Sequence, residues 1–221
     1  KIEELWMLLL ILCYSASMIM MMKKSGKMMK KHNLVIFVSG GGTNCENIIR
    51  YFVSHPSVTV QLVVSSNAKA GALERVRPYA VPTYIANKEI LASSQFVNML
   101  RFEYQIDFIV LAGFLQHVPD NLISAFDHRI INIHPALLPK YGGKGMYGRH
   151  VHEAVKANGD TETGMTIHWV NNIMDGGAII SQFTTKVAPS DTVEDITHKV
   201  HLLEMEHFPR EIERILSELD L

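Results

Sequence analysis

Two polar residues that follow an apolar run have the types and spacing needed for acid–base chemistry on a carbonyl group. They are Asn132 and His134, in the segment Asn-Ile-His-Pro at residues 132–135. Because side chains two apart leave a strand on the same face, both can reach one substrate atom. A histidine with an ordinary pKa of about 6.5 can transfer a proton near neutral pH, and an amide can donate to a developing oxyanion. A structural pair at a strand end is the alternative interpretation.

A third candidate is Asp175, which precedes two glycines at residues 176–177. Its carboxylate could project over the end of a neighbouring strand, although an aspartate before glycine is most often a turn former. His168 lies in an expected strand and is interpreted as a core or rim histidine. A zinc site is not favoured, because the residues that could form it fall where the chain is expected to enter a helix: His150, His152 and Glu153. We therefore predict a site without a metal.

The glycine-rich segment at residues 39–44, Ser-Gly-Gly-Gly-Thr-Asn, is predicted to bind phosphate. It lies between an expected strand and an expected helix, where backbone N–H groups and the helix dipole attract an anion. No Gly-Lys-Ser or Gly-Lys-Thr sequence follows, and Cys45 stands where a dinucleotide fingerprint has a small residue. The pattern therefore favours a monophosphate. A tight turn needed only for packing is the alternative.

An alternation of apolar runs and helical patterns predicts the fold that would hold these residues. The expected strands are 34–38, 58–65, 82–86, 107–112, 129–133, 165–170 and 178–187. The expected helices are 46–52, 71–77, 88–102, 120–126, 151–157 and 193–216. This order is typical of an α/β domain with a mostly parallel central sheet and helices on both faces. Ligands of such sheets bind at the carboxyl ends of the strands.

The composition disfavours several classes of function. The 221 residues fit one domain, and the formal net charge of −1 gives no general field that would gather nucleic acid or an anionic membrane. The two cysteines, Cys13 and Cys45, have neither metal-type nor paired spacing. This usage fits a reducing compartment, so a cytoplasmic location is expected.

The first 31 residues are expected to lie outside the core. A mostly apolar run at 5–22 is followed by a lysine-rich stretch at 23–31. A signal peptide is disfavoured because its charge normally precedes the apolar run. A membrane anchor of about minimum length is a second possibility. We favour an upstream extension, and expect the functional domain at 32–221 without membrane attachment of its core.

Four motifs, in their order and spacing, resemble the phosphoribosylglycinamide formyltransferase family of purine biosynthesis, over about residues 33–216. They are Val-Ser-Gly-Gly-Gly-Thr-Asn at 38–44, Val-Leu-Ala-Gly-Phe at 110–114, Asn-Ile-His-Pro-Ala-Leu-Leu-Pro-Lys-Tyr at 132–141 and Asp-Gly-Gly at 175–177. The resemblance implies a Rossmann-like formyltransferase fold. It also implies that the catalytic residues are Asn132, His134 and Asp175.

The resemblance further implies which residues bind the two substrates. The phosphorylated acceptor would contact Gly42, Thr43, Asn44, His201 and Glu204. The co-substrate 10-formyltetrahydrofolate would contact Leu115, Gln116, His117, Val118, Asn132, Asn171, Asn172, Ile173 and Met174. Several relatives have arginine at the position of Gln116 and glutamine at that of His201, so the roles of these two side chains stay open.

The reaction implied by the resemblance is transfer of a formyl group from 10-formyltetrahydrofolate to the amine of N1-(5-phospho-D-ribosyl)glycinamide, a step of de novo purine biosynthesis. Methionyl-tRNA formyltransferase and formyltetrahydrofolate deformylase share the core motifs but add a tRNA domain after the core or a regulatory domain before it. We expect neither extra domain here, and so no nucleic-acid partner. Other folate-dependent formyl transfer or hydrolysis, or a non-catalytic sensor of a phosphorylated ligand, are the alternatives.

Overall fold

The computed structural model describes residues 30–219, and the fold below is that of the unit that begins at Lys31. Apart from residues 30 and 31, the leader discussed above lies outside the described residues. The proposed boundary between a leader and a functional domain therefore stays a prediction.

Seven strands form one sheet in the order β3-β2-β1-β4-β5-β6-β7. Strands β1 to β5 run parallel, β6 is antiparallel to β5, and β7 is antiparallel to β6. The central strands read as continuous apolar runs because helices cover both of their faces. The predicted mostly parallel sheet is thus confirmed. The strands are β1 (His32–Val38), β2 (Val58–Ser65), β3 (Thr83–Ile85), β4 (Phe108–Leu111), β5 (Ile130–His134), β6 (Glu162–Trp169) and β7 (Ile179–Lys186).

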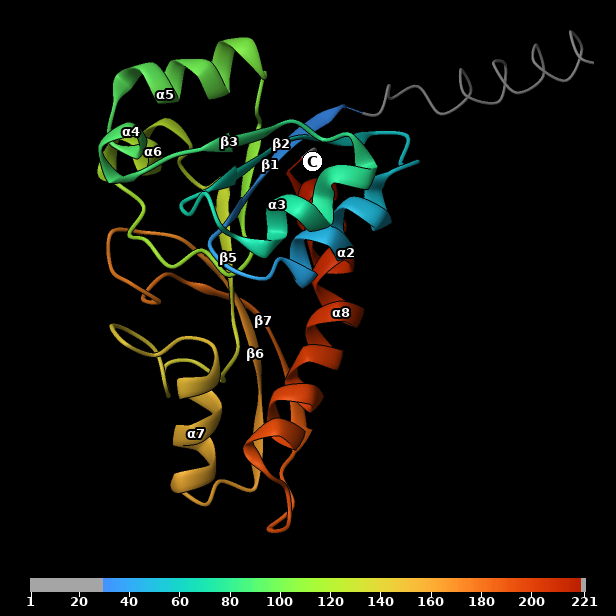
Figure 1. The fold of residues 1–221 in the computed structure, drawn as a ribbon, viewed down its shortest axis with the longest axis vertical. Helices are drawn as coiled ribbons and strands as arrows, with labels where there is room; N and C mark the ends of the chain where they lie inside the picture. Colours follow the sequence, from blue (N-terminus) through green and yellow to red (C-terminus); the bar gives the residue numbers. More distant parts are fainter. Residues whose placement is uncertain (1–29, 220–221) are drawn as a thin grey trace, which may run out of the picture. The chain divides into compact units, whose positions relative to one another are not determined.

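The helices divide between the two faces of this sheet (Figure 1). Helices α2, α3 and α8 contribute to one buried cluster, and α4, α5 and α6 to the other. Helix α8 also extends beyond the sheet's parallel part, where α7 lies beside it. The helices are α2 (Thr43–Phe52), α3 (Gly71–Val76), η1 (Arg77–Tyr79), α4 (Lys88–Leu91), α5 (Ser94–Asn98), η2 (Met99–Glu103), α6 (Asp120–Ala125), α7 (Arg149–Ala157) and α8 (Val193–Glu218).

The expectation of one continuous helix at 88–102 is wrong, because a capping residue interrupts it. The hydroxyl oxygen of Ser93 accepts the backbone N–H of Phe96 at 3.2 Å and so starts α5. In the same way, the side chain of Asn87 accepts the N–H of Ile90 at the start of α4. A serine that caps a new helix competes with continuation of the previous one.

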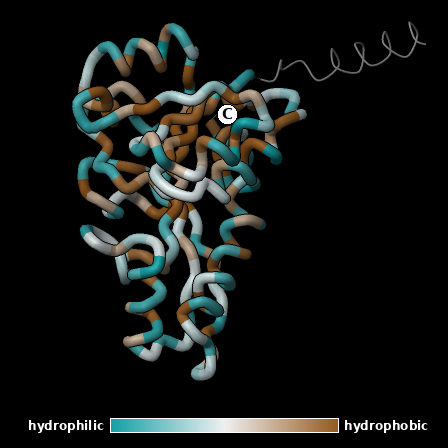
Figure 2. The backbone as a smooth tube through the Cα atoms, viewed as in Figure 1, coloured by the Kyte–Doolittle hydropathy of each residue, from teal (hydrophilic) through white to brown (hydrophobic). Residues whose placement is uncertain are grey.

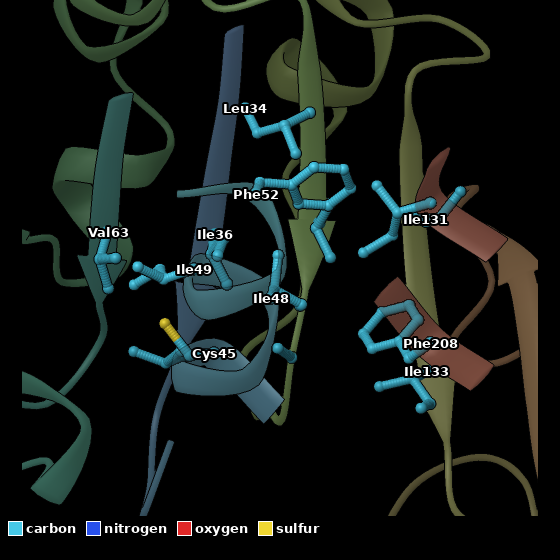
Figure 3. Packing of buried hydrophobic residues seen from close by; sticks show 14 of the residues in the cluster. Leu34, Ile36, Cys45, Ile48, Ile49, Phe52, Val63, Ile131, Ile133 and Phe208 are labelled. Carbon is cyan, nitrogen blue, oxygen red and sulfur yellow. The ribbon is translucent and has the colours of Figure 1, made fainter. Parts of the chain in front are cut away.

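Alternate side chains of β1 enter two separate cores. Leu34 and Ile36 lie in the cluster that includes α2 and α8, whereas Val35 and Phe37 face α5 and the region of β4. Figure 3 shows side chains of β1 and α2 pointing toward one another in the first cluster. The hydropathy colouring of Figure 2 is brown along the central strands and largely teal on the outer helices. Packing on both faces holds β1 at the centre of the sheet, and this fixes the place of the loop that follows it.

The C-terminal helix α8 runs from a capped start to the neighbourhood of α2. The side chains of Thr192 and Asp195 form a reciprocal capping box at its N-terminus. The amide of Asn47 in α2 donates to the carbonyl oxygen of Met205 at 2.8 Å. Pro209 lies inside the helix. Among the helices of residues 30–219, none combines the length and apolar character needed to cross a bilayer.

The direction in which successive strands are added to the sheet reverses at β1. From β1 the chain continues to β2 on one side, while β4 pairs with β1 on the other. The carboxyl ends of β1 and β4 therefore lie at a topological switch point, which is the position where parallel α/β sheets bind ligands. The antiparallel pairing of β5 and β6 places Asn132 opposite His168 and His134 opposite Thr166.

Candidate active site

A cavity of about 890 Å³ opens where the loops after β4, β5 and β6 meet the first turn of α2 and the N-terminal half of α8. Its volume lies at the upper end of the usual range for ligand sites, which is about 300–1,000 Å³. Of the residues predicted to be catalytic or to bind a substrate, it is lined by Asn44, Leu115, Gln116, His117, Val118, Asn132, His134, Asn171, Ile173, Met174, Asp175, His201 and Glu204. Gly42, Thr43 and Asn172 are absent from its lining.

His134 ends β5 with its ring buried and its two nitrogens in different surroundings. Its Nε2 lies 2.7 Å from the carbonyl oxygen of Tyr141, and because a carbonyl only accepts, Nε2 must carry a proton. Its Nδ1 lies 3.7 Å from Asp175 Oδ2, which is an ion-pair distance but longer than a hydrogen bond. The side chains of His134 and Asp175 are only 4% and 11% exposed. Nδ1 is therefore the nitrogen left for chemistry.

The carboxylate of Asp175 is held by a loop and a tight turn. Its Oδ2 accepts the backbone N–H of Gly143 at 2.9 Å, and its own φ of +53° is in the left-handed region. The following turn needs glycine at position 177, because an added Cβ would lie 1.7 Å from the carbonyl oxygen of Trp169. The backbone conformation of the Asp-Gly-Gly turn thus places the Asp175 carboxylate next to His134 at the end of β5.

Asn132 lies two residues before His134, the last residue of β5, and contacts a second histidine. Its Nδ2 is 3.0 Å from Nε2 of His168, which in turn places Nδ1 2.9 Å from the carbonyl oxygen of Trp169. Nε2 of His168 also lies 3.7 Å from Asp175 Oδ1. Burial lowers the pKa of His168, and this exceeds the opposing influence of the Trp169 carbonyl and the Asp175 charge.

The segment after His134 is fixed by a buried hydroxyl. Thr166 Oγ1 donates to the carbonyl oxygen of Ala136 at 2.6 Å and accepts the N–H of Leu138 at 3.0 Å. The amide of Gln182 donates to Thr166 Oγ1 and to the carbonyl oxygen of Leu138, each at 2.9 Å. This network determines where the chain runs between β5 and Tyr141, whose carbonyl oxygen contacts His134.

The predicted phosphate loop enters α2 through a glycine in the left-handed conformation. Gly42 has a φ of +79°, and an added Cβ would lie 2.4 Å from Cβ of Ala72. No side chain caps α2, so the first N–H groups of the helix stay available to an anion. Ser39 connects this loop to the next one, because its Oγ accepts the N–H of Leu115 at 2.9 Å.

Asn44 in the first turn of α2 joins the cavity to α8. Its Nδ2 donates to Glu204 Oε2 at 2.9 Å, while its Oδ1 is buried without a hydrogen-bond partner among residues 30–219. His201 Nδ1 lies 3.3 Å from the same oxygen of Glu204. This hydrogen bond raises the pKa of His201 above its ordinary value. The acceptor residues expected from the resemblance are therefore neighbours in space.

The opposite end of the cavity is apolar and open. Leu115, Ile173 and Met174 line it with 54%, 63% and 45% of their surfaces exposed. Nε2 of His117 lies 3.4 Å from the carbonyl oxygen of Asn172, which links the two loops that carry them. Exposed apolar side chains at the rim of a cavity are suited to a flat aromatic ligand.

The structure adds residues to the site that the sequence did not single out for it. His168 had been interpreted as a core or rim histidine, and it does lie in a buried strand, but it also contacts Asn132. His152 lines the cavity, burial lowers its pKa, and its Nδ1 has no hydrogen-bond partner among the described residues. Within residues 30–219, no three histidine, cysteine, aspartate or glutamate side chains are grouped as a metal ion requires.

Comparison with known proteins matches this arrangement to one family. The model of the formyl transferase family covers residues 32–212. The phosphoribosylglycinamide formyltransferase of Escherichia coli (strain K12) is 34% identical over 80% of this chain and 83% of its own. The chloroplastic enzyme of that name from Arabidopsis thaliana is 41% identical over 76% of this chain. The chain covers 59% of the length of that relative and 61% of the length of the one from Vigna unguiculata.

Solved structures share the fold. The phosphoribosylglycinamide formyltransferase from Coxiella burnetii is 34% identical, with a TM-score of 0.72 over 85% of this chain and 86% of that one. Glycinamide ribonucleotide transformylase 1 from Symbiobacterium toebii is 29% identical, with a TM-score of 0.75 over 85% of this chain and 89% of that one. These similarities confirm the Rossmann-like formyltransferase fold expected from the motifs.

Proposed function

The chain belongs to the formyl transferase family, and we propose that it transfers the formyl group of 10-formyltetrahydrofolate to the amine of N1-(5-phospho-D-ribosyl)glycinamide. The observation that carries this proposal is the convergence of Asn132, His134 and Asp175 on one cavity that also reaches Asn44 and α8. The relatives named phosphoribosylglycinamide formyltransferase support the choice of acceptor. The reaction would serve purine biosynthesis.

The acceptor is proposed to bind at the α2 end of the cavity. Its phosphate would meet the free N–H groups at the start of α2, in the loop of Gly42, Thr43 and Asn44. Glu204 has one oxygen, Oε2, engaged by Asn44 and His201, and its other oxygen would accept hydrogen bonds from the sugar or the amine. The fixed carboxylate would thus align the acceptor with its amine toward β5.

The folate is proposed to bind at the apolar end of the same cavity. Its ring system would lie between the loop of residues 115–118 and the loop of residues 171–174, with the exposed side chains of Leu115 and Ile173 against it. Holding donor and acceptor in one cavity makes the transfer effectively unimolecular, which can provide a large share of the rate.

The chemical step requires stabilisation of one oxygen and transfer of one proton. The acceptor amine attacks the formyl carbon, and the carbonyl electrons move onto oxygen to give a tetrahedral intermediate. An N–H of Asn132 and the protonated form of His134, through Nδ1, would donate to this oxyanion. The bond from carbon to the folate nitrogen then breaks, and that nitrogen receives the proton that the amine loses. The Asp175 carboxylate, 3.7 Å from Nδ1 of His134, would help relay this proton.

A steady-state assay with the purified full chain tests the proposal. We expect formyl transfer to depend on both substrates, and the His134→Ala variant prepared in parallel excludes activity carried over from the expression host. Release of formate at the same rate without the acceptor would instead support hydrolysis of the folate. Binding of the phosphorylated acceptor without any turnover would favour the sensor.

The remaining proposals concern the extent of the functional domain and its location in the cell. We propose that the functional domain comprises residues 32–221 and works in the cytoplasm with small-molecule substrates alone. The start of the family match at residue 32 supports this boundary. The plant relatives carry chloroplastic names, so the location of the native protein is to be tested by cell fractionation.

A further inference from the structure

A buried histidine outside the proposed catalytic group contacts the amide on which oxyanion stabilisation depends. His168 lies on β6 directly opposite Asn132 on β5, and only 2% of its surface is exposed. Its two ring nitrogens make the two contacts already described, to the backbone of Trp169 and to the side chain of Asn132. The proposed mechanism assigns no step to this histidine.

The contact with Trp169 decides which nitrogen of His168 carries a proton. A carbonyl oxygen only accepts hydrogen bonds, so Nδ1, 2.9 Å away, must be the donor. In the neutral ring the other nitrogen, Nε2, then carries a lone pair and can only accept. Burial lowers the pKa of His168, which favours this neutral form.

The tautomer of His168 in turn decides how the amide of Asn132 is turned. A lone pair on Nε2 pairs with an N–H group and not with an oxygen, so Nδ2 of Asn132 must face His168 at 3.0 Å. One of the two protons on Nδ2 is used in this bond, and the second stays free to donate to a ligand. A fully protonated ring would require the opposite orientation, with Oδ1 toward His168.

We propose that His168 is a positioning residue for formyl transfer: its bond to the Trp169 carbonyl fixes a ring that holds the amide nitrogen of Asn132 in place to donate to the oxyanion. This inference rests on the proposed function for its kinetic consequence, but its structural content does not depend on activity. Asp175 does not replace this contact, because its nearest oxygen is 3.7 Å from Nε2 of His168.

The first test is made on the free wild-type protein by nitrogen-15 NMR. We expect the ring signals of His168 at neutral pH to be those of a neutral imidazole protonated on Nδ1. We also expect one side-chain amide proton of Asn132 to show a coupling or cross-peak to Nε2 of His168. A ring protonated on Nε2, or doubly protonated, would overturn the proposal whether or not the protein is an enzyme.

Two substitutions distinguish the loss of the hydrogen bonds of His168 from a change in the size of its side chain. His168→Leu removes both hydrogen bonds, and we expect kcat to fall by about 10- to 100-fold, the scale of a misplaced reacting group, with both KM values near those of the parent. His168→Gln keeps an acceptor within reach of Asn132, and we expect it to retain a clearly larger share of kcat. Thr163→Val is the matched control, since it alters another buried residue of β6 that lies outside the cavity.

A double-mutant cycle tests whether His168 affects kcat through the amide of Asn132. In an Asn132→Ala background, His168→Leu has no amide left to position and should lower kcat little further. An equal loss in both backgrounds would show that His168 acts through another group and would overturn the proposal. If His168→Leu does not fold, the same cycle is run with His168→Ala, which also removes both hydrogen bonds, and the NMR result stands by itself. If the wild type has no transferase activity, the proposed function fails while the NMR test still decides the orientation of the amide.

Discussion

The two ends of the proposed site present their polar groups by different means. At the β5 end, Asn132, His134 and Asp175 present side chains that are each held by another group of the protein. At the α2 end, the loop of residues 40–44 presents mainly backbone, because three of its residues are glycines and no side chain caps the helix. A group that meets a developing charge must be oriented before the reaction, whereas a remote phosphate needs only N–H groups that point the same way.

This difference has a consequence for how substitutions act. Changes at the β5 end remove interactions made mainly in the transition state and should lower kcat. Changes at the α2 end remove interactions made equally in the ground and transition states, and should raise KM for one substrate. Kinetic parameters can therefore show whether the division between the two ends is real.

The largest effect is expected from the pair on β5. Replacing Asn132 or His134 by alanine should lower kcat by about 10²–10³-fold, since each removes a donor or proton carrier from the oxyanion. Substrate binding, measured by calorimetry with each ligand, should largely persist. A variant that kept near-normal turnover would place the chemistry elsewhere in the cavity.

The next effect concerns the charge behind His134. Asp175→Asn keeps an oxygen that can accept the N–H of Gly143 but removes the negative charge 3.7 Å from the ring. We expect kcat to fall by about 10²-fold, as for other acid–base groups, while the melting temperature changes little. Asp127→Asn is a suitable control, because that carboxylate is exposed, lies outside the cavity and pairs with the exposed His128. Equal kinetic effects of the two substitutions would return Asp175 to the role of a turn residue.

The sequence predicted the motif residues of the β5 end but not all of the contacts between them. The convergence of Asn132, His134 and Asp175 followed from their motifs, and the strand at 58–65 was located correctly because turn residues bound its apolar run. The contact of His168 with Asn132 depends on which residues face each other across β5 and β6. A buried histidine in a strand has the same local sequence pattern with or without a polar partner. The contact could therefore be found only from the register of β5 against β6 in the structure.

The backbone groups that hold the site residues could not be predicted from the sequence either. The carbonyl oxygen of Tyr141 and the N–H of Gly143 hold His134 and Asp175, but every residue type supplies these groups. The broken helix at 88–102 has a different cause, since Ser93 is compatible with a helix interior and only its bond to Phe96 makes it a cap. Local pattern therefore predicted elements and motif residues better than the contacts between them.

The α2 end should respond more weakly and in one substrate only. Thr43→Ala combined with Asn44→Ala removes two side chains at the start of α2 and frees Glu204 from its bond to Asn44. Loss of one or two hydrogen bonds should raise KM for the phosphorylated acceptor by about 10-fold, with kcat nearly unchanged. The KM for the folate in the same preparation is the internal control. A selective rise in the folate KM would reverse the assignment of the two ends.

The smallest effect is expected from removal of the leader, which should leave both ends of the cavity unchanged. The first strand of the sheet begins at His32, and the family match also begins at residue 32. A chain that starts at Met28 keeps all of β1 and should match the full chain in kcat, in both KM values and in melting temperature. A chain that starts at Ser39 is the matched control, because it lacks β1, whose Leu34 to Val38 side chains are fully buried between both helical layers, and it should not fold. If the Met28 chain lost solubility or changed either KM, residues before β1 would belong to the functional domain.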